Sequence, residues 1–267
     1  MAREIINLGT PPNGTDGDTI RTAMDKCNIN FKEIYDGFSS IPYHISGLRV
    51  SRPSVNSIAV SVGSAYIPSS GKSIFLSSPI TKTGISVAAN TWLHGYLFES
   101  SPGIIDVEWV TTAPSAPYSI TARTKNGDPS RRYIGSVKSS TANNFYNFYH
   151  AVETGLVTYL ENTATGPFLL VAGGVATTTT AVSASAIAPV SAHIAIVNVL
   201  NLSSTAYVNL SNSNGPSASS GFITVCAPKT TTISPTPLNS SQQYTYAFDS
   251  SPSGETYHRL FGYCFER

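Results

Sequence analysis

Charged side chains are scarce in this sequence. Asp, Glu, Lys and Arg make up 12% of its 267 residues, about half the usual share of roughly 25%. The net charge is +1, which gives no electrostatic reason to expect DNA, RNA or an anionic membrane as a partner. The longest apolar stretches, 168–176 and 194–202, are far shorter than the roughly 20 residues that span a bilayer. The first residues lack the apolar segment of a secretory signal, so we expect synthesis in the cytoplasm without membrane insertion.

Metal-binding and catalytic motifs are also missing. The three cysteines, Cys27, Cys226 and Cys264, stand in no zinc or redox spacing. Buried free thiols are the favoured interpretation, and a Cys226–Cys264 disulfide stays open. The histidines at 44, 94, 150, 193 and 258 form no HxH or HExxH motif, and no GxSxG, P-loop or dinucleotide fingerprint is present. We expect no cofactor, no metal and no enzymatic activity.

Glycan depolymerisation is the enzymatic alternative, and the positions of the acidic residues bear on it. It needs two carboxylates about 5–10 Å apart across the sugar bond. Asp106 and Glu108 share one face of an expected strand, but exposed carboxylates on a strand face usually serve solvation. The remaining acids of the last third do not cluster: Glu153, Glu161, Asp249, Glu255 and Glu266.

Ser, Thr and Asn fill the surface positions that charged residues leave, and this composition favours strands and turns. We predict a mainly β fold of sandwich-type domains. In the middle of the chain we expect strands at 57–67 (interrupted at Gly63), 73–77, 85–89, 92–99, 104–111 and 132–138. In the last third we expect strands at 155–160, 168–172, 193–202, 206–210, 221–227, 243–248 and 256–265.

One helix is predicted from 19 to 35, after the turn-rich segment 7–17. Asp16 or Asp18 is the expected cap at its start, and Gly37 the expected end. A stripe of apolar residues follows a heptad spacing along it: Ile20, Met24, Cys27, Phe31 and Ile34. A lone helix of this length is marginal in water, so the stripe must pack on something. The chain's own β structure and a second copy of the chain are both open at this stage.

The segment INLGTPPNGTDGDTIRTAMDKCNINFKEIYDGF resembles the opening segment of tail fibres, tailspikes and baseplate-associated proteins of tailed bacteriophages. The similarity lies in an extended N-x-G-T-x-x-N-x-x-x-G-D-[ST] pattern followed by a helix reading R-x-A-[FM]-x-K-x-N-x-N-F-x-E-[IL]-Y. It covers roughly a tenth of the chain, with Cys27 where a larger aliphatic residue is usual. The resemblance implies a homotrimer attached to the virion, with attachment through Asn7, Gly9, Thr10, Asn13, Gly17 and Asp18.

A weaker resemblance lies in the middle of the chain. Residues 110–145 are similar to a segment of phage structural β domains that carries GD-x-S-x-RY-[IL]-G. Asp128 and Ser130 suit an Asx-type turn, which Arg132 can tie down, so we interpret the motif as structural.

Binding is the function that remains for the last third of the chain, where Lys229 is the only charged residue between Glu161 and Asp249. The resemblance to tail fibres implies that the binding partner is a host receptor. Aromatic faces and amide or hydroxyl groups suit sugar binding, and loops carry function on rigid scaffolds. The candidates near expected turns and strand ends are Tyr207, Asn209, Asn212, Asn214, Tyr244, Tyr246, Tyr257 and His258.

We therefore expect three parts: an attachment segment and helix at 1–40, a β-sandwich shoulder at 41–150 and a C-terminal β domain at 151–267. The expected function is that of a trimeric tail fibre or receptor-binding protein in the virion tail. Its expected partners are a tail or baseplate protein and a host surface glycan or protein receptor. A structural baseplate or adaptor protein that holds other tail proteins is the alternative, and a depolymerase is a weaker one.

Overall fold

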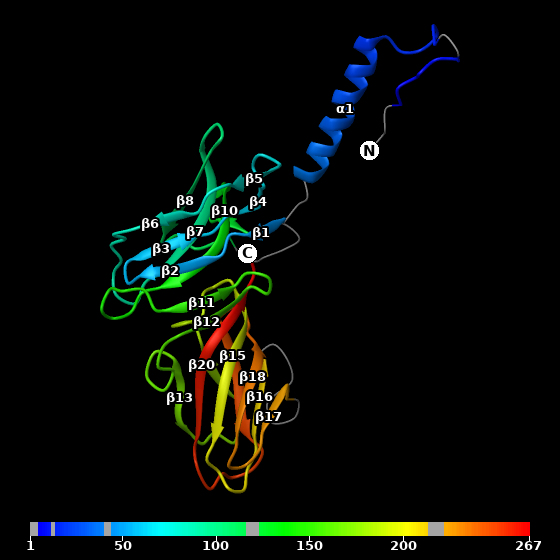
Figure 1. Cartoon of the computed structure of the whole chain (residues 1–267). Helices are drawn as coiled ribbons and strands as arrows, with labels where there is room; N and C mark the ends of the chain where they lie inside the picture. Colours follow the sequence, from blue (N-terminus) through cyan, green and yellow to red (C-terminus); the bar gives the residue numbers. More distant parts are fainter. Residues whose placement is uncertain (1–4, 12–13, 40–43, 116–122, 213–221) are drawn as a thin grey trace.

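The computed structural model describes residues 5–11, 14–39, 44–115, 123–212 and 222–267. Within them it contains one helix and twenty strands, so the chain is mainly β as predicted. The helix α1 (Ile20–Ser39) projects from the β structure at one end, and the last strand runs back through the middle of the fold (Figure 1). No helix among the described residues is long and apolar enough to cross a membrane.

Helix α1 starts at a threonine cap. The Thr22 amide donates to Thr19 Oγ1 (3.2 Å), and the Ala23 amide donates to the Thr19 carbonyl (2.8 Å). A threonine hydroxyl at this position satisfies an amide that the first turn leaves without a helical partner. The predicted cap at Asp16 or Asp18 is therefore wrong. The helix also continues to Ser39, past the predicted end at Gly37.

Three antiparallel sheets form the middle of the chain. Their strand orders are β1-β4-β5, β2-β3-β6 and β8-β7-β10-β9. The bounds are β1 (Ile45–Gly47), β2 (Val50–Ser54), β3 (Ser57–Val60), β4 (Gly63–Ile67), β5 (Lys72–Leu76), β6 (Ile80–Lys82), β7 (Trp92–Ser101), β8 (Ile104–Val110), β9 (Thr124–Lys125) and β10 (Asp128–Lys138). The predicted hairpin is confirmed as β7 and β8, which pair antiparallel.

Two further antiparallel sheets form the last part of the chain. One has the order β11-β12-β20-β15-β18, with β13 also pairing with β20, and the other has the order β14-β19-β16-β17. The bounds are β11 (Phe148–Ala151), β12 (Leu156–Tyr159), β13 (Leu169–Gly174), β14 (Thr180–Ser183), β15 (Ala192–Asn201), β16 (Val208–Asn212), β17 (Thr224–Cys226), β18 (Thr231–Pro237), β19 (Gln243–Phe248) and β20 (Thr256–Phe265).

Most predicted strands have a counterpart in the structure, with one false prediction and several strands that were not predicted. The predicted strand at 85–89 is wrong, and the structure has an irregular segment there. Strand β18 lies in a proline-containing stretch that reads as a turn; Pro235 and Pro237 are tolerated because β18 is an edge strand.

The larger hydrophobic core crosses the expected boundary at residue 150. It joins Tyr96 and Tyr133 of the middle sheets to Tyr159, Tyr263 and Phe265 of the last part of the chain. A smaller cluster lies within the middle sheets and contains Leu48, Val60, Ala65, Leu76, Leu97, Val107 and Ile134. The β structure is therefore packed as a continuous body, while α1 stands beside it.

Candidate functional site

The segment before α1 folds back on itself through Asn7. The Asn7 amide donates to Asp18 Oδ2 (2.7 Å), and the Asp18 amide donates to the Asn7 carbonyl (2.8 Å). The Asn7 side chain donates from Nδ2 to the Asp16 carbonyl (3.0 Å) and accepts at Oδ1 from the Gly9 amide (3.0 Å). One asparagine therefore closes a loop whose two ends are more than ten residues apart in sequence.

Thr10 and Asp16 close the inner part of the same loop. Asp16 Oδ1 accepts from the Thr10 amide and Asp16 Oδ2 accepts from Thr10 Oγ1, both at 2.6 Å. These hydrogen bonds favour the carboxylate and hold the pKa of Asp16 below its usual value. Gly9 has φ +75°, and a Cβ there would lie 2.6 Å from the Gly14 carbonyl oxygen. A Cβ on Gly17 would lie 2.9 Å from the Gly9 nitrogen, so both glycines permit close backbone approach.

Lys26 fastens the loop to the helix. Its Nζ lies 2.7 Å from Asp18 Oδ2 and donates to the Ile5 carbonyl at 2.9 Å. The hydrogen bond from Lys26 is the largest cause of the lowered pKa of Asp18. Lys26 thus joins the chain before the loop, the end of the loop and the helix at one point.

The residues expected to contact the virion therefore build the loop. Asn7, Gly9, Thr10, Gly17 and Asp18 serve hydrogen bonds or close contacts within it, and Asn13 lies outside the described residues. The exposed side chains of this segment include two large apolar ones. Leu8 is 85% exposed and Ile5 is 66% exposed.

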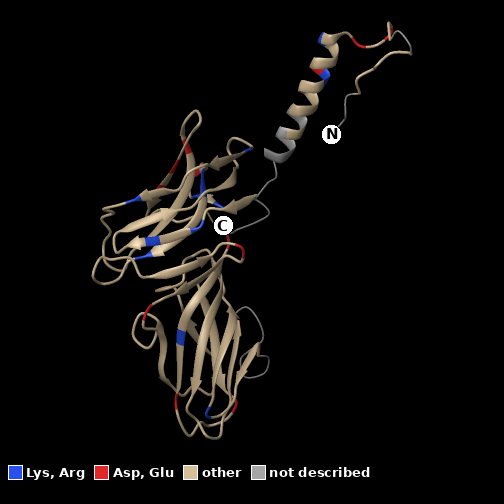
Figure 2. Cartoon of the chain, viewed as in Figure 1, with Lys and Arg blue, Asp and Glu red and all other residues tan. Residues whose placement is uncertain are grey.

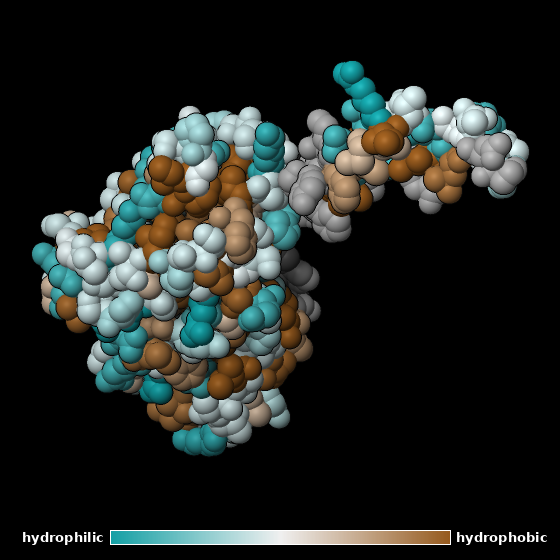
Figure 3. All heavy atoms as spheres, turned by 45° about the horizontal axis from the view of Figure 1, so that its top comes forward, coloured by the Kyte–Doolittle hydropathy of each residue, from teal (hydrophilic) through white to brown (hydrophobic). Residues whose placement is uncertain are grey.

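The heptad stripe of α1 is exposed. Ile20, Met24, Phe31 and Ile34 are 46–86% exposed, and Cys27 is half-buried. Figure 3 shows hydrophobic atoms gathered along the projecting helix, with hydrophilic atoms on another side of it. Helix α1 contacts the β structure at β5, but these four stripe residues remain exposed in the part of the chain that the structure describes.

The eight residues expected to meet a receptor fall into two groups. Asn209, Tyr244, Tyr246 and His258 are buried, and the Tyr244 hydroxyl lies 2.8 Å from His258 Nδ1. Their side chains therefore form the interior. Tyr207 is exposed, Asn212 and Tyr257 are half-buried, and Asn214 lies outside the described residues.

The loops that follow β15 and β19, coloured yellow and red in Figure 1, lie at the end opposite α1. We call loops 202–207 and 249–255 the distal loops. The Tyr207 amide donates to Asp249 Oδ1 (3.0 Å), and the Asp249 amide donates to the Tyr207 carbonyl (3.1 Å). The Ser204 amide donates to Ser253 Oγ at 2.9 Å, which ties the two loops together again.

Carboxylates at this end were missed as candidates because they are not neighbours in sequence. Tyr257 donates from its hydroxyl to Glu255 Oε2 at 2.6 Å, and this bond raises the pKa of Tyr257. Figure 2 shows acidic and basic residues at this end of an otherwise weakly charged part of the chain. The distal loops thus combine an exposed aromatic ring with carboxylates and hydroxyl groups.

The acids weighed for catalysis are held in ion pairs. Asp106 Oδ1 lies 2.7 Å from Lys82 Nζ, and Glu108 Oε1 lies 2.9 Å from Lys125 Nζ and 3.4 Å from Arg131 Nε. The Asx turn is confirmed, since Asp128 Oδ1 accepts from the amide (3.0 Å) and the hydroxyl (2.6 Å) of Ser130.

Arg131 is the arginine that reaches this turn. It donates to Ser130 Oγ at 2.9 Å, whereas the expected Arg132 is fully buried in β10. The cysteines are free thiols, and among the described residues no group of three or more His, Cys, Asp or Glu is placed to hold a metal.

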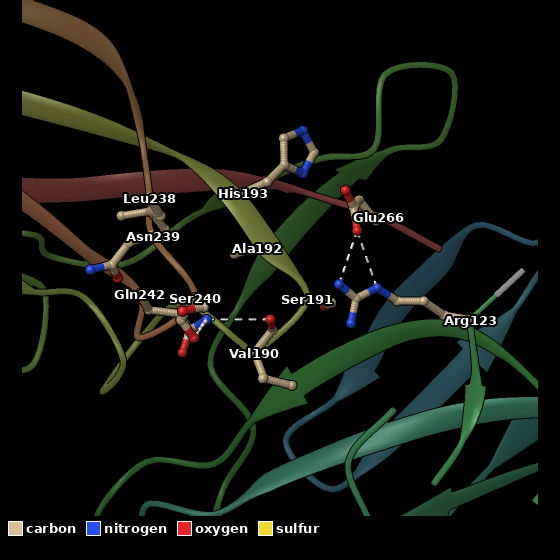
Figure 4. Close-up of a pocket in the computed structure, with 10 residues that line it drawn as sticks. All are labelled: Arg123, Val190, Ser191, Ala192, His193, Leu238, Asn239, Ser240, Gln242 and Glu266. Carbon is tan, nitrogen blue, oxygen red and sulfur yellow. Dashed lines mark hydrogen bonds and ion pairs between the residues drawn. The ribbon is translucent and has the colours of Figure 1, made fainter. Parts of the chain in front are cut away.

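A cavity of about 480 Å³ lies where the middle sheets meet the last part of the chain (Figure 4). The Arg123 guanidinium crosses it and donates to Glu266 Oε2 from Nη2 (2.9 Å) and Nε (3.3 Å). Leu238 and Gln242 lie across from this pair, and His193 also lines the cavity. Its charged groups pair with each other, so this cavity reads as part of the contact between the two halves of the β structure.

No protein-family model matches the chain, and no curated protein is similar to it.

Proposed function

We propose that this chain is a self-associating attachment protein of a bacteriophage tail. Its N-terminal loop docks in the virion, and its opposite end meets the host surface. The observation that carries the proposal is the exposed apolar stripe of α1, which directly follows the loop built by the tail-fibre motif. Exposed apolar surface of this kind marks an interaction site.

Self-association explains the stripe. Ile20, Met24, Phe31 and Ile34 repeat on one side of α1 and are 46–86% exposed. Two or three copies of α1 side by side would bury these residues in a coiled-coil seam. A homotrimer is the assembly that the resemblance to tail fibres implies, and we retain it as the proposed state.

Docking in the virion is assigned to the apolar side chains of the loop. The motif residues Asn7, Thr10 and Asp18 form hydrogen bonds within the loop, so we propose that they act by shaping it. Leu8 and Ile5 are the large apolar side chains that this segment exposes, and we propose that they enter an apolar groove of a tail or baseplate protein.

The last part of the chain is proposed to be a two-sheet sandwich. The orders β13-β20-β15-β18 and β14-β19-β16-β17 match the alternation of a jelly roll, an architecture found in viral and lectin domains. The proposed receptor contact is the distal loops, where Tyr207 is the exposed member of the expected set. The receptor is a surface glycan or a surface protein.

An adsorption-competition assay tests this function. Purified full-length chain is mixed with host cells before phage is added, and free phage is counted. We expect the wild-type chain to block adsorption and Tyr207→Ser to lose most of that effect. Tyr149→Ser is the matched control, since Tyr149 is 47% exposed against 44% for Tyr207 and lies outside the distal loops. Equal blocking by both variants would contradict the distal-loop assignment.

A structural adaptor is the second candidate, favoured by the burial of Asn209, Tyr244, Tyr246 and His258. An adaptor predicts that the purified chain leaves adsorption unchanged but binds particles assembled without it. The two candidates therefore predict opposite results in the adsorption-competition assay.

A further inference from the structure

The contact between β1–β10 and β11–β20 is buried and polar; we call it the joint. At its centre the Tyr133 hydroxyl lies 2.7 Å from Ser191 Oγ and 2.6 Å from Ser136 Oγ. Tyr133 is fully buried, and its ring packs edge-on against Phe265 with centroids 6.0 Å apart. The two halves therefore meet through specific hydrogen bonds as well as apolar packing.

His150 accepts a hydrogen bond across the joint from a backbone amide. Its Nδ1 accepts from the Val50 amide at 3.1 Å, across a hundred residues of sequence. A backbone amide only donates, so Nδ1 carries no proton in the closed joint. The proton of the neutral ring is then on Nε2, which is buried and has no hydrogen-bond partner among the described residues.

The surroundings of His150 oppose a positive charge. The guanidinium groups of Arg49 and Arg267 act on it, and the ring of Phe265 packs against it with centroids 5.4 Å apart. Arg267 is fixed on both halves, since it donates to the Gly47 carbonyl (3.0 Å) and the Val152 carbonyl (2.8 Å). Glu153 is the nearby acid, and it acts on Arg267. Burial first, and then the two arginines, lower the pKa of His150 to about 3.

We propose that His150 makes the joint an acid-sensitive coupling, in which protonation of Nδ1 breaks the bond from Val50 and separates the two halves while each keeps its strands paired. The driving force is the return of His150 to water. Because the ring there has an ordinary pKa near 6.5, the open population rises about tenfold for each pH unit below that value, until the pKa of the closed state is reached. The joint is closed at neutral pH and opens in acid.

His94 is the internal comparison. Its Nδ1 lies 2.7 Å from Ser136 Oγ, and burial lowers its pKa to about 4. A hydroxyl either donates or accepts, so the His94–Ser136 contact survives protonation with its direction reversed. The partner of His150 Nδ1 is a backbone amide, which cannot accept a hydrogen bond, so protonation of Nδ1 breaks this contact.

Trp92 reports on the joint, because its Nε1 donates to the Ser185 carbonyl (3.4 Å) and its ring meets Tyr263. In the full chain with Trp109→Phe, Trp92 is the remaining one of two tryptophans. Its fluorescence is followed from pH 7 to pH 3.5 beside far-UV circular dichroism. We expect a reversible fluorescence change at higher pH than any loss of strand signal.

His150→Asn is the decisive variant, since the Asn amide oxygen replaces the Nδ1 acceptor and does not titrate. It should move the Trp92 transition at least about one pH unit lower, as removal of a tenfold-per-unit proton linkage requires. His193→Asn, at an exposed histidine, should leave the transition unchanged. The same midpoint in His150→Asn and wild type, or coincident fluorescence and dichroism changes, would overturn the proposal.

Nitrogen-15 NMR of the wild-type imidazoles gives a readout that does not depend on a variant folding. We expect His150 as the neutral Nε2–H tautomer at pH 7, becoming charged in step with the Trp92 change. A charged His150 ring in a chain whose Trp92 signal is still that of pH 7 would contradict the coupling.

Discussion

The N-terminal loop and helix differ from the β structure in where their apolar side chains lie. In the β structure Tyr133, Tyr263 and Phe265 are at most 5% exposed, whereas on α1 Phe31 is 59% exposed and Met24 is 57% exposed. The described residues 5–11 and 14–19 are held by hydrogen bonds to one another and to Lys26, and the stripe of α1 is left exposed. The comparison shows that the β structure buries its large aromatic side chains within one copy, whereas α1 leaves its apolar stripe exposed, which is the basis for the proposed self-association.

Acid should have the largest effect, and it should act on the β structure, which contains three buried histidines. Burial lowers the pKa of His94 to about 4 and that of His150 and His258 to about 3. The unfolded chain binds protons on these residues below about pH 6.5, but the folded chain excludes them until pH 3–4, so stability falls as pH falls through this window. Each histidine contributes up to ~1.4 kcal/mol per pH unit. Urea unfolding at pH 7, 6 and 5 measures this loss. Equal stability at the three values would contradict it.

Phenylalanine truncation compares the regions residue for residue. Phe265→Ala removes a ring packed between Tyr133, Tyr263 and His150, and should lower the free energy of unfolding by about 3–5 kcal/mol. Phe31→Ala should leave unfolding of the β structure unchanged, because its ring is exposed in the single chain. Chemical denaturation followed by tryptophan fluorescence at low protein concentration measures both. A comparable loss in Phe31→Ala would show that α1 packs on the β structure.

The helix cap should have a smaller and local effect. Thr19→Ala removes the acceptor for the Thr22 amide and should destabilise α1 by ~1 kcal/mol. Amide exchange in the first turn should accelerate accordingly, while exchange in β15 and β20 should not change. Thr19→Ser keeps the hydroxyl and serves as the control.

The loop should give the smallest effect on the rest of the chain. Asp16→Ala removes both bonds to Thr10, so exchange of the Thr10 amide should rise to the rate of an open segment. The melting temperature of the β structure should stay the same. Retained protection at Thr10 would contradict the role assigned to Asp16.

Periodicity predicted the elements better than it predicted their surroundings. The alternating pattern at 256–265 predicted β20 to the residue, but it does not say which face is interior, and so His258 was expected at the surface. The stripe of α1 was predicted, whereas its exposure depends on tertiary contacts that a pattern does not contain. Pro235 and Pro237 concealed β18, since their tolerance depends on its edge position in a sheet.

Local hydrogen bonding was the other source of error. Asp16, Asp18 and Thr19 are all capable caps, and the choice fell on Thr19 because the two aspartates bind Thr10, Asn7 and Lys26. These partners lie up to eleven residues away, beyond the range of a capping pattern. The joint and the distal loops likewise bring together residues that are distant in sequence.

Sedimentation velocity over a wide concentration range tests the central claim most directly. We expect the wild-type chain to sediment as an oligomer, a trimer in the proposed state, and Met24→Ser/Phe31→Ser to sediment as a monomer with an unchanged strand signal. Asn28→Ser, an exposed polar residue of the same helix, is the control and should keep the oligomer. A wild-type chain that is monomeric at every concentration, or a double variant that associates as the wild type does, would contradict the account.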